Sequence, residues 1–265
     1  MKGGIYAALE ALRQLARANI PTSLPVTVLL TPDEEVGSPS TRDLIEAEAA
    51  KHKIVLVPEP AQSDGGVTTG RFAIARFDLG ATGRSSHAGA RLSEGRSAIH
   101  EMAKQVLSIE SMTTPACTFS VGVIQGGQWV NCVSTICRGE ALSMAKRQPD
   151  LDRAVEQMLA LSHDTEGVSF QVTRGVTRPV WEPSPATVAL YNQARAIAGQ
   201  IGFDLPHGSA GGGSDGNFTG AMGIPTLDGL GVEGAGLHTP NEHIVADGLA
   251  RRVRLLAGLL ATVQL

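Results

Sequence analysis

The chain has 265 residues, of which 42% are hydrophobic and 18% charged, and a formal net charge of −4. This composition is typical of a globular protein, and the negative balance argues against a nucleic-acid surface or a polybasic membrane anchor. No apolar run approaches the length of a membrane span. The three cysteines lack paired spacing, which indicates reduced thiols and predicts a cytoplasmic protein.

The first part of the chain, residues 1–71, alternates helical and strand patterns. Apolar residues at helical spacing predict a helix over residues 4–18. The run "PVTVLL" (25–30) predicts a short strand buried on both faces. A second helix over 40–50 and a second strand over 53–57 follow. This order indicates an α/β domain with parallel strands.

The pattern changes over residues 72–179. We expect extended strands and helices there in the order β-α-β-β-α-β, over residues 71–80, 94–110, 117–127, 136–145, 150–162 and 167–177. That order is the ferredoxin-like split motif. The segment is therefore predicted to form an α+β domain inserted within the first one.

The α/β pattern returns over residues 180–265. A helix over 185–201, a strand over 224–230 and a last helix over 246–262 complete it. The predicted fold is thus a mostly parallel sheet with helices, into which the ferredoxin-like domain is inserted.

Acidic residues follow both N-terminal strands. Asp33, Glu34 and Glu35 come directly after the first, and Glu59 ends the second. His238 lies in a glycine-flanked loop beyond a later strand. Because parallel strands present their carboxyl ends at one edge of a sheet, two carboxylates and an imidazole could meet there as a zinc or related divalent site, with a third carboxylate as general base. A solvated acidic turn is the alternative interpretation.

Seven short motifs make the pattern more specific. They are "MKGG" (1–4), "TPDEEVGS" (31–38), "PEP" (58–60), "GRSSHAGA" (83–90), "GGQWVNCV" (126–133), "GGGSDGNF" (211–218) and "HTPNEH" (238–243). Taken in this order, the set resembles the M20 family of zinc metallopeptidases, which includes carboxypeptidases and deacylases. The inserted split β-α-β domain agrees with that family's lid and dimerisation domain. The resemblance also implies a phosphorylase/hydrolase-like parallel sheet that is incomplete at its N-terminus.

The resemblance implies roles for four residues. Glu34 resembles the catalytic base that deprotonates the metal-activated water. Glu35 and His238 resemble ligands that share one zinc ion, and Glu59 resembles a ligand of the other. The family holds two zinc ions per active site, with cobalt or manganese as alternative metals. Adjacent glutamates can divide these tasks because a carboxylate that binds metal is a poor base.

Two lid residues have implied roles as well. His87, in "SSHAG", resembles a histidine that reaches the partner subunit's active site and stabilises the oxyanion, which implies a homodimer through the lid. Asn131 resembles an asparagine that holds substrate. The structural alternatives are a histidine with a local hydrogen bond and a turn residue.

The substrate's carboxylate requires a cationic partner. Where one branch of the family has an arginine for this purpose, ungapped counting reaches Met144. Either the register shifts and Arg147 is the clamp, or the pocket prefers another substrate. Gly212 and Gly213 are expected to line the substrate pocket with backbone. Their loop lacks the lysine of a phosphate-binding motif, which excludes that interpretation.

The start of the sequence departs from the family. There an aspartate that bridges both metals precedes "MKGG", and a His-x-Asp lies further upstream, whereas Met1 here begins the motif. We expect a truncated chain with weak or no activity; a complementing polypeptide or a degenerate relative are the alternatives. The predicted function is zinc-dependent hydrolysis of an amide bond in an N-acyl amino acid or short peptide, the alternative being a non-catalytic pseudoenzyme or dimerising fragment.

Overall fold

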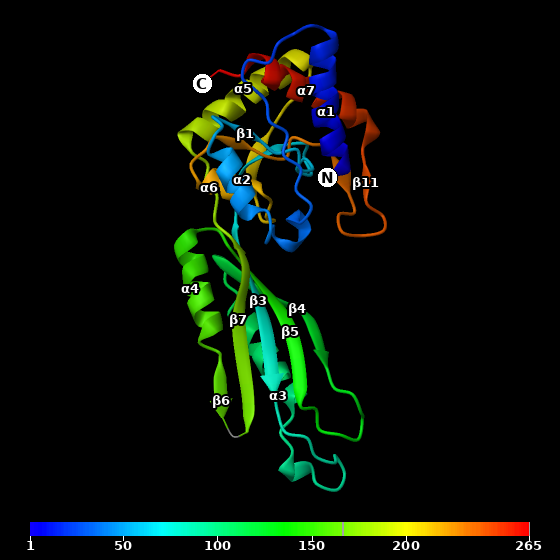
Figure 1. Cartoon of the computed structure of the whole chain (residues 1–265), viewed down its shortest axis with the longest axis vertical. Helices are drawn as coiled ribbons and strands as arrows, with labels where there is room; N and C mark the ends of the chain where they lie inside the picture. The colour runs from blue at the N-terminus through cyan, green and yellow to red at the C-terminus, as the bar shows by residue number, and fades with distance from the viewer. Residues whose placement is uncertain (166, 265) are drawn as a thin grey trace. The chain divides into compact units, whose positions relative to one another are not determined.

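The chain divides into two compact units. The computed structural model describes residues 1–165 and 167–264, and Figure 1 traces the chain. The first unit comprises Met1–Arg71 with Trp181–Leu265, and the second comprises Phe72–Val180. Each unit has its own hydrophobic core. The change in sequence pattern places the boundaries after residues 71 and 179.

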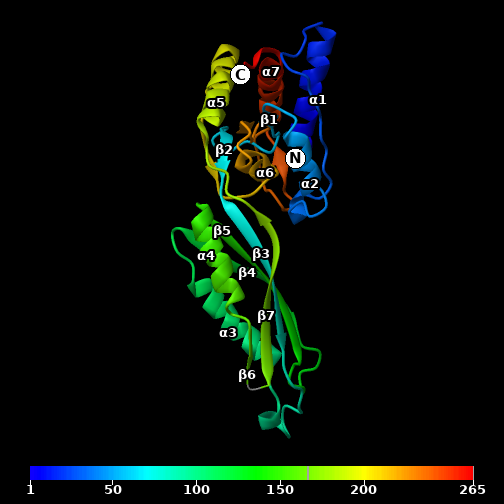
Figure 2. The same ribbon diagram turned by 60° about the vertical axis from the view of Figure 1, so that its left-hand side comes forward.

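Long helices supply most of the first unit's core. Its helices are α1 (Lys2–Arg17), α2 (Arg42–Ala49), α5 (Pro185–Ile201), α6 (Gly216–Ala221) and α7 (Ala246–Thr262). Helix α7 lies between α1 and α5, as Figure 2 shows. Its buried residues Leu255, Leu256 and Leu259 recur at helical spacing and face the core.

The strands of the first unit form short pairs. Strands β1 (Val55–Leu56) and β9 (Thr226–Leu227) are parallel, and so are β2 (Val67–Arg71) and β8 (His207–Ala210). An isolated bridge between Thr68 and Asp228 links the two pairs. Strands β10 (Gly234–Ala235) and β11 (His243–Ile244) form an antiparallel hairpin. The predicted parallel pairing is present, in two-stranded pairs rather than in one broad sheet.

The predicted buried strand over 25–30 is wrong. Those residues are extended but belong to no strand, and Val28 and Leu30 are 48% and 64% exposed. A run of apolar residues is buried only where neighbouring strands pair with its backbone and cover its faces. Among the described residues, no strand pairs with this segment.

The second unit is a five-stranded antiparallel sheet with helices on one face. Its elements are β3 (Ala73–Thr82), α3 (Ala98–Ser111), β4 (Cys117–Gly126), β5 (Ile136–Ala145), α4 (Gln148–Leu159), β6 (His163–Thr165) and β7 (Val168–Arg178). The strand order is β4-β5-β3-β7-β6. Without the short β6, this is the element order of the ferredoxin-like split motif expected from the sequence.

Helices α3 and α4 cover the same face of this sheet (Figure 2). Strand β3 alternates buried and more exposed residues, and its buried positions include Ala73, Ala75 and Ala81. Small side chains at these positions allow the helices to approach the sheet closely. In the part of the chain that the structure describes, no helix is both long and apolar enough to cross a membrane.

Candidate active site

A short 3-10 helix, Glu34–Val36, carries the two glutamates of the acidic loop. The carboxylate of Asp33, which precedes it, accepts hydrogen bonds from the backbone N–H of Ser40 (2.8 Å), its hydroxyl (2.7 Å) and the hydroxyl of Thr41. These bonds, the Thr41 bond foremost, lower the pKa of Asp33 to about 2. Asp33 therefore stabilises the turn. This leaves Glu34 and Glu35 as the acids of this loop that could bind a metal ion or act as a base.

Glu35 contacts His238 directly. Its Oε2 lies 3.1 Å from Nε2 of His238, and the two side chains are 72% and 78% exposed. His238 follows β10 in the connection to β11 and has a left-handed backbone with φ of 61°. This conformation is uncommon for a residue other than glycine and often marks functional sites. The contact joins residues more than 200 positions apart, as the metal hypothesis requires.

Glu59 follows β1, in a segment that two glycines enclose. A Cβ on Gly4 would lie 1.8 Å from the carbonyl oxygen of Pro58, and one on Gly231 would lie 2.7 Å from that of Glu59. The N–H of Gly231 also donates to the Glu59 carbonyl, at 2.8 Å. Only glycine permits such close approach, so α1 and the loop after β9 together fix the Glu59 backbone.

The Glu59 carboxyl group holds its proton unusually strongly. Burial, followed by the negative charges of Asp228 and Glu34, raises its pKa to about 8, although Arg71 acts in the opposite direction. In the metal-free chain Glu59 is therefore largely protonated at neutral pH. A bound cation would offset both the burial of the charge and the repulsion from Asp228 and Glu34.

This shift predicts a pH dependence of stability. Because the folded-state pKa exceeds the unfolded value, the stability that Glu59 contributes is fully present below about pH 4.5 and is lost as the pH rises through about 8. We expect Glu59→Gln, which mimics the protonated acid, to raise the free energy of unfolding of the metal-free chain at pH 9 but not at pH 4. Urea unfolding at both pH values, with chelator present, tests this; an equal effect at both would contradict it.

A buried ion pair that the sequence interpretation missed lies close to Glu59. Nε of Arg71 donates to Asp228 at 2.6 Å, and the two side chains are 9% and 0% exposed. The hydroxyl of Ser214 donates to the same carboxylate at 2.5 Å, and Nη1 of Arg71 donates to the carbonyl of Gly212 at 2.7 Å. The glycine loop is therefore fixed to strands β2 and β9. The sequence did contain a signal for Asp228, because this acid follows strand β9 just as Glu59 follows strand β1.

His87 and Asn131 lie on adjacent segments of the second unit. His87 bridges to Cys132, and the N–H of Ala88 donates to the Asn131 carbonyl at 3.0 Å. Nδ1 of His87 accepts from the backbone N–H groups of Gly89 and Ala90, both at 3.2 Å. A neutral ring with this pattern carries its proton on Nε2. Nε2 of His87 is thereby oriented as a hydrogen-bond donor.

Arg147 lies at the other end of the same sheet. It is the residue before α4 and lies two residues after β5, which ends at Ala145. Asn131 instead precedes the start of β5 at Ile136. The length of this ten-residue strand, about 30 Å at roughly 3.3 Å per residue, separates the two ends. Within one unit, Arg147 and Asn131 therefore do not form a single subsite.

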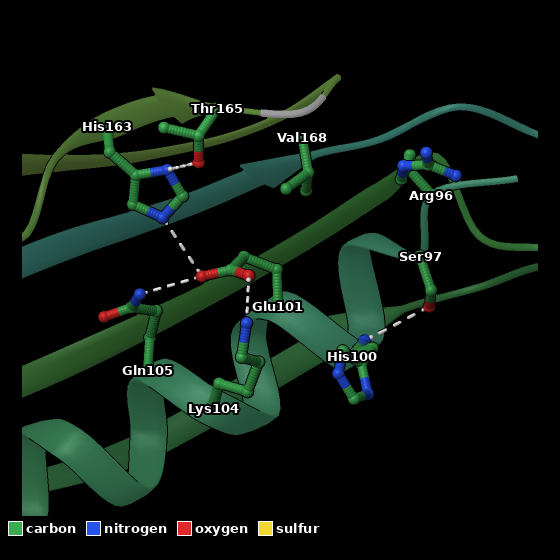
Figure 3. Close-up of a pocket in the computed structure, with 9 residues that line it drawn as sticks. All are labelled: Arg96, Ser97, His100, Glu101, Lys104, Gln105, His163, Thr165 and Val168. Carbon is green, nitrogen blue, oxygen red and sulfur yellow. Dashed lines mark hydrogen bonds and ion pairs between the residues drawn. The ribbon is translucent and has the colours of Figure 1, made fainter.

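The second unit has a cavity of about 390 Å³ between α3 and the β6–β7 hairpin, which Figure 3 shows. The buried carboxylate of Glu101 lies at its base. Burial alone would raise the Glu101 pKa, but hydrogen bonds from Gln105 and His163 and the charge of Lys104 lower it overall. Both oxygens of the Glu101 carboxylate have partners, at 2.8 Å to Gln105, 3.1 Å to His163 and 3.4 Å to Lys104. The cluster therefore joins α3 to β6.

The predicted metal ligands are of the chemical types that zinc binds. Zinc accepts imidazole nitrogen and carboxylate oxygen, and the contact between Glu35 and His238 supplies one of each. Within residues 1–165 and 167–264, no three side chains of His, Cys, Asp or Glu lie close enough together to hold a metal ion. The described residues thus bring two ligands into contact and place Glu59 elsewhere in the same unit.

Comparison with known proteins identifies the class. Residues 1–262 match peptidase family M20/M25/M40. Because this match covers nearly the whole chain, the protein belongs to that family, and the resemblance inferred from its motifs is confirmed.

Individual relatives add detail. The chain is 29% identical over 268 residues to carboxypeptidase G2 of Pseudomonas sp. (strain RS-16), covering 98% of this chain and 64% of the relative. It is 31% identical over 150 residues to acetylornithine deacetylase of Myxococcus xanthus, covering 52% of this chain and 38% of the relative. The chain thus spans less than two thirds of the length of either protein.

Solved structures share the fold. The aminopeptidase PepT of Bacillus cereus ATCC 10987 superposes with a TM-score of 0.75 at 24% identity, over 98% of this chain and 70% of that one. A tripeptidase of Staphylococcus aureus superposes with a TM-score of 0.79 at 22% identity, over 98% and 69%. The mixed α/β architecture is therefore that of M20 peptidases.

Proposed function

We propose that this chain carries out the zinc-dependent hydrolysis of an amide bond next to a free carboxylate. The substrate would be an N-acyl amino acid or the C-terminus of a short peptide. The observation that carries the proposal is the contact between Glu35 and His238, with Glu34 beside it on the same turn. The names of the relatives, a carboxypeptidase, a deacetylase and a tripeptidase, support an amide bond as the target.

In this proposal Glu35 and His238 hold one zinc ion, and Glu59 is a ligand of a second. Bound zinc polarises the carbonyl and lowers the pKa of water toward about 7. Glu34 accepts a proton from the water as its oxygen attacks the carbonyl carbon. It then delivers that proton to the leaving nitrogen as the C–N bond breaks, which yields a carboxylate and an amine.

In the proposed homodimer, the second unit would supply substrate contacts to the partner subunit. Nε2 of His87 is a suitable donor to the oxyanion, because Nδ1 is engaged by backbone N–H groups. Asn131, on the adjacent segment, would hold the substrate. Arg147 as a carboxylate clamp, and Gly212 and Gly213 as pocket-lining residues, remain predictions.

Zinc binding tests the proposal. The purified chain is passed through chelator-free gel filtration, its metal content measured by mass spectrometry, and Zn²⁺ titrated by calorimetry. We expect Glu35→Gln and His238→Ala each to weaken binding by more than about 100-fold, and Glu46→Gln, on α2, to leave it unchanged. Equal binding by all four proteins would contradict the proposal.

A non-catalytic role is the second candidate. The observation that favours it is that, among the residues the structure describes, no three His, Cys, Asp or Glu side chains could hold a metal ion, whereas catalytic zinc sites have three protein ligands. Assays for amine release from N-acyl amino acids in excess Zn²⁺ separate the candidates. Zinc binding without any hydrolysis would favour the non-catalytic role.

A homodimer through the second unit is a further proposal. Strand β4 lies at one edge of the sheet, is ten residues long, and exposes Val123 and Ile124 by 39% and 51%. Long apolar edges are templates for pairing with another chain. We predict that the chain sediments as a dimer at micromolar concentration, and that Ile124→Lys converts it to a monomer. Asp164→Lys, on the opposite edge strand β6, is the control; a monomeric parent chain would contradict the prediction.

A further inference from the structure

Asp215 of the glycine loop contacts both sides of the acidic loop. Its Oδ2 accepts a hydrogen bond from the hydroxyl of Thr31 at 3.1 Å, and its Oδ1 accepts one from the hydroxyl of Ser38 at 2.5 Å. Thr31 lies three residues before Glu34, and Ser38 lies three residues after Glu35. A single carboxylate, 177 and 184 positions away in sequence, therefore holds both ends of the turn that carries the glutamates.

The Ser38 end of this turn is conformationally demanding. Gly37 and Ser38 both have left-handed backbones, with φ of 94° and 58°. Such a conformation is unfavourable for serine and persists only where surrounding contacts enforce it. Ser38 is completely buried. Its N–H donates to the Asp33 carbonyl at 2.9 Å, and its hydroxyl donates to Asp215. The Asp215 bond is thus one of the contacts that enforce the strained turn.

The side chain of Asp215 does not cap the helix that it precedes. It precedes helix α6, where an aspartate commonly accepts a hydrogen bond from the first helical turn. Here its side chain makes no such bond. The side chain is directed to the acidic loop instead, while the neighbouring Ser214 donates to Asp228. Asp215 therefore contacts the acidic loop, whereas the adjacent Ser214 contacts the buried carboxylate of Asp228.

We propose that Asp215 is the positioning residue of the candidate active site: it fixes the turn that presents Glu34 and Glu35, so that Glu35 meets His238. The inference deepens the proposed function and rests on it for the roles of the two glutamates. Asp215 contacts neither substrate nor metal in this proposal and acts through Thr31 and Ser38.

Hydrogen exchange of the whole 265-residue chain tests the positioning directly. The N–H groups of Val36, Gly37 and Ser38 donate within the turn, so their exchange rates report its order. We expect Asp215→Ala to accelerate exchange at these amides by at least about tenfold, while amides of helix α7 keep their rates. Asp204→Ala is the matched control, because Asp204 is an exposed aspartate of the same unit. It should change neither the exchange rates of the turn nor those of helix α7.

Two further variants separate a direct contact from general loosening. Asp215→Asn keeps one acceptor oxygen and should give an intermediate acceleration. Ser38→Ala should also accelerate exchange, and adding it to Asp215→Ala should change the rates little further, because Asp215→Ala already removes the bond that Ser38→Ala removes. Additive effects would overturn the direct contact.

Zinc titration of the same variants is the second measurement. We expect Asp215→Ala to weaken zinc binding by about tenfold or more, in the range seen for residues that orient metal ligands. Unchanged exchange in the turn, or faster exchange with unchanged zinc affinity, would overturn the positioning role. If the parent chain binds no zinc, the proposed function fails, and the exchange rates alone then decide whether Asp215 orders the turn.

Discussion

Replacing Glu34 by glutamine should lower the rate of amide hydrolysis by about 100-fold to 10,000-fold, the contribution typical of a general base. Glutamine preserves the size of the side chain but cannot accept the proton of the attacking water. Zinc affinity should stay within about twofold of the parent chain, since a residue that acts only as base binds no metal. Amine release under single-turnover conditions, with calorimetric Zn²⁺ titration in parallel, measures both quantities.

Glu35→Gln is the matched comparison for this prediction. The two glutamates are adjacent on one 3-10 turn, so the variants differ by a single position. Glu35→Gln should lose zinc affinity and, with it, hydrolysis. If Glu34→Gln weakened zinc binding as strongly as Glu35→Gln, the division of roles between base and ligand would be incorrect.

The sequence predicted the long elements better than the short ones. The helices expected over 185–201 and 246–262 begin and end within a residue of α5 and α7, because their apolar periodicity runs over several turns. Strands β2 and β8 were not predicted. Their sequences, VTTGR and HGSA, are short and rich in glycine and hydroxyl residues. Burial of such strands depends on their neighbours, which local pattern does not reveal.

The same distinction holds for the site. Glu34, Glu35 and Glu59 could be singled out because each acid follows a strand or a strand-like run. The roles of Arg71 and Asp215 could not be predicted in this way, because the groups that they contact lie more than 140 positions away in sequence. Contacts across such separations depend on the folded chain, and neither residue type is unusual in its local sequence.

Removing the Asp228 carboxylate should destabilise the first unit strongly. Asp228→Ala would leave the Arg71 guanidinium buried without its partner, which typically costs about 3–5 kcal/mol of unfolding free energy. The hydroxyl of Ser214 and the N–H of Gly229, both donors to this carboxylate at 2.5 Å, would lose their acceptor too. By contrast, Glu46→Ala breaks the exposed pair with Arg42 and should cost less than about 1 kcal/mol.

Urea unfolding followed by Trp181 fluorescence measures this loss, because Trp181 is 1% exposed and belongs to the first unit. A Trp129→Phe background removes the signal of the exposed tryptophan in the second unit. A loss below about 1 kcal/mol for Asp228→Ala would mean that the buried pair contributes little.

The same pair links stability to the proposed chemistry. The Asp228 charge is, after burial, the largest influence that raises the Glu59 pKa. Asp228→Asn keeps the size of the side chain but removes this charge, so the pKa of Glu59 should fall and its carboxylate should form at lower pH. Zinc binding would then release fewer protons near neutral pH, since ligand carboxylates must be ionised. Calorimetry in buffers of different ionisation enthalpy counts those protons. An unchanged count would show that Asp228 does not control the ionisation of Glu59, and that burial and the charge of Glu34 hold its proton.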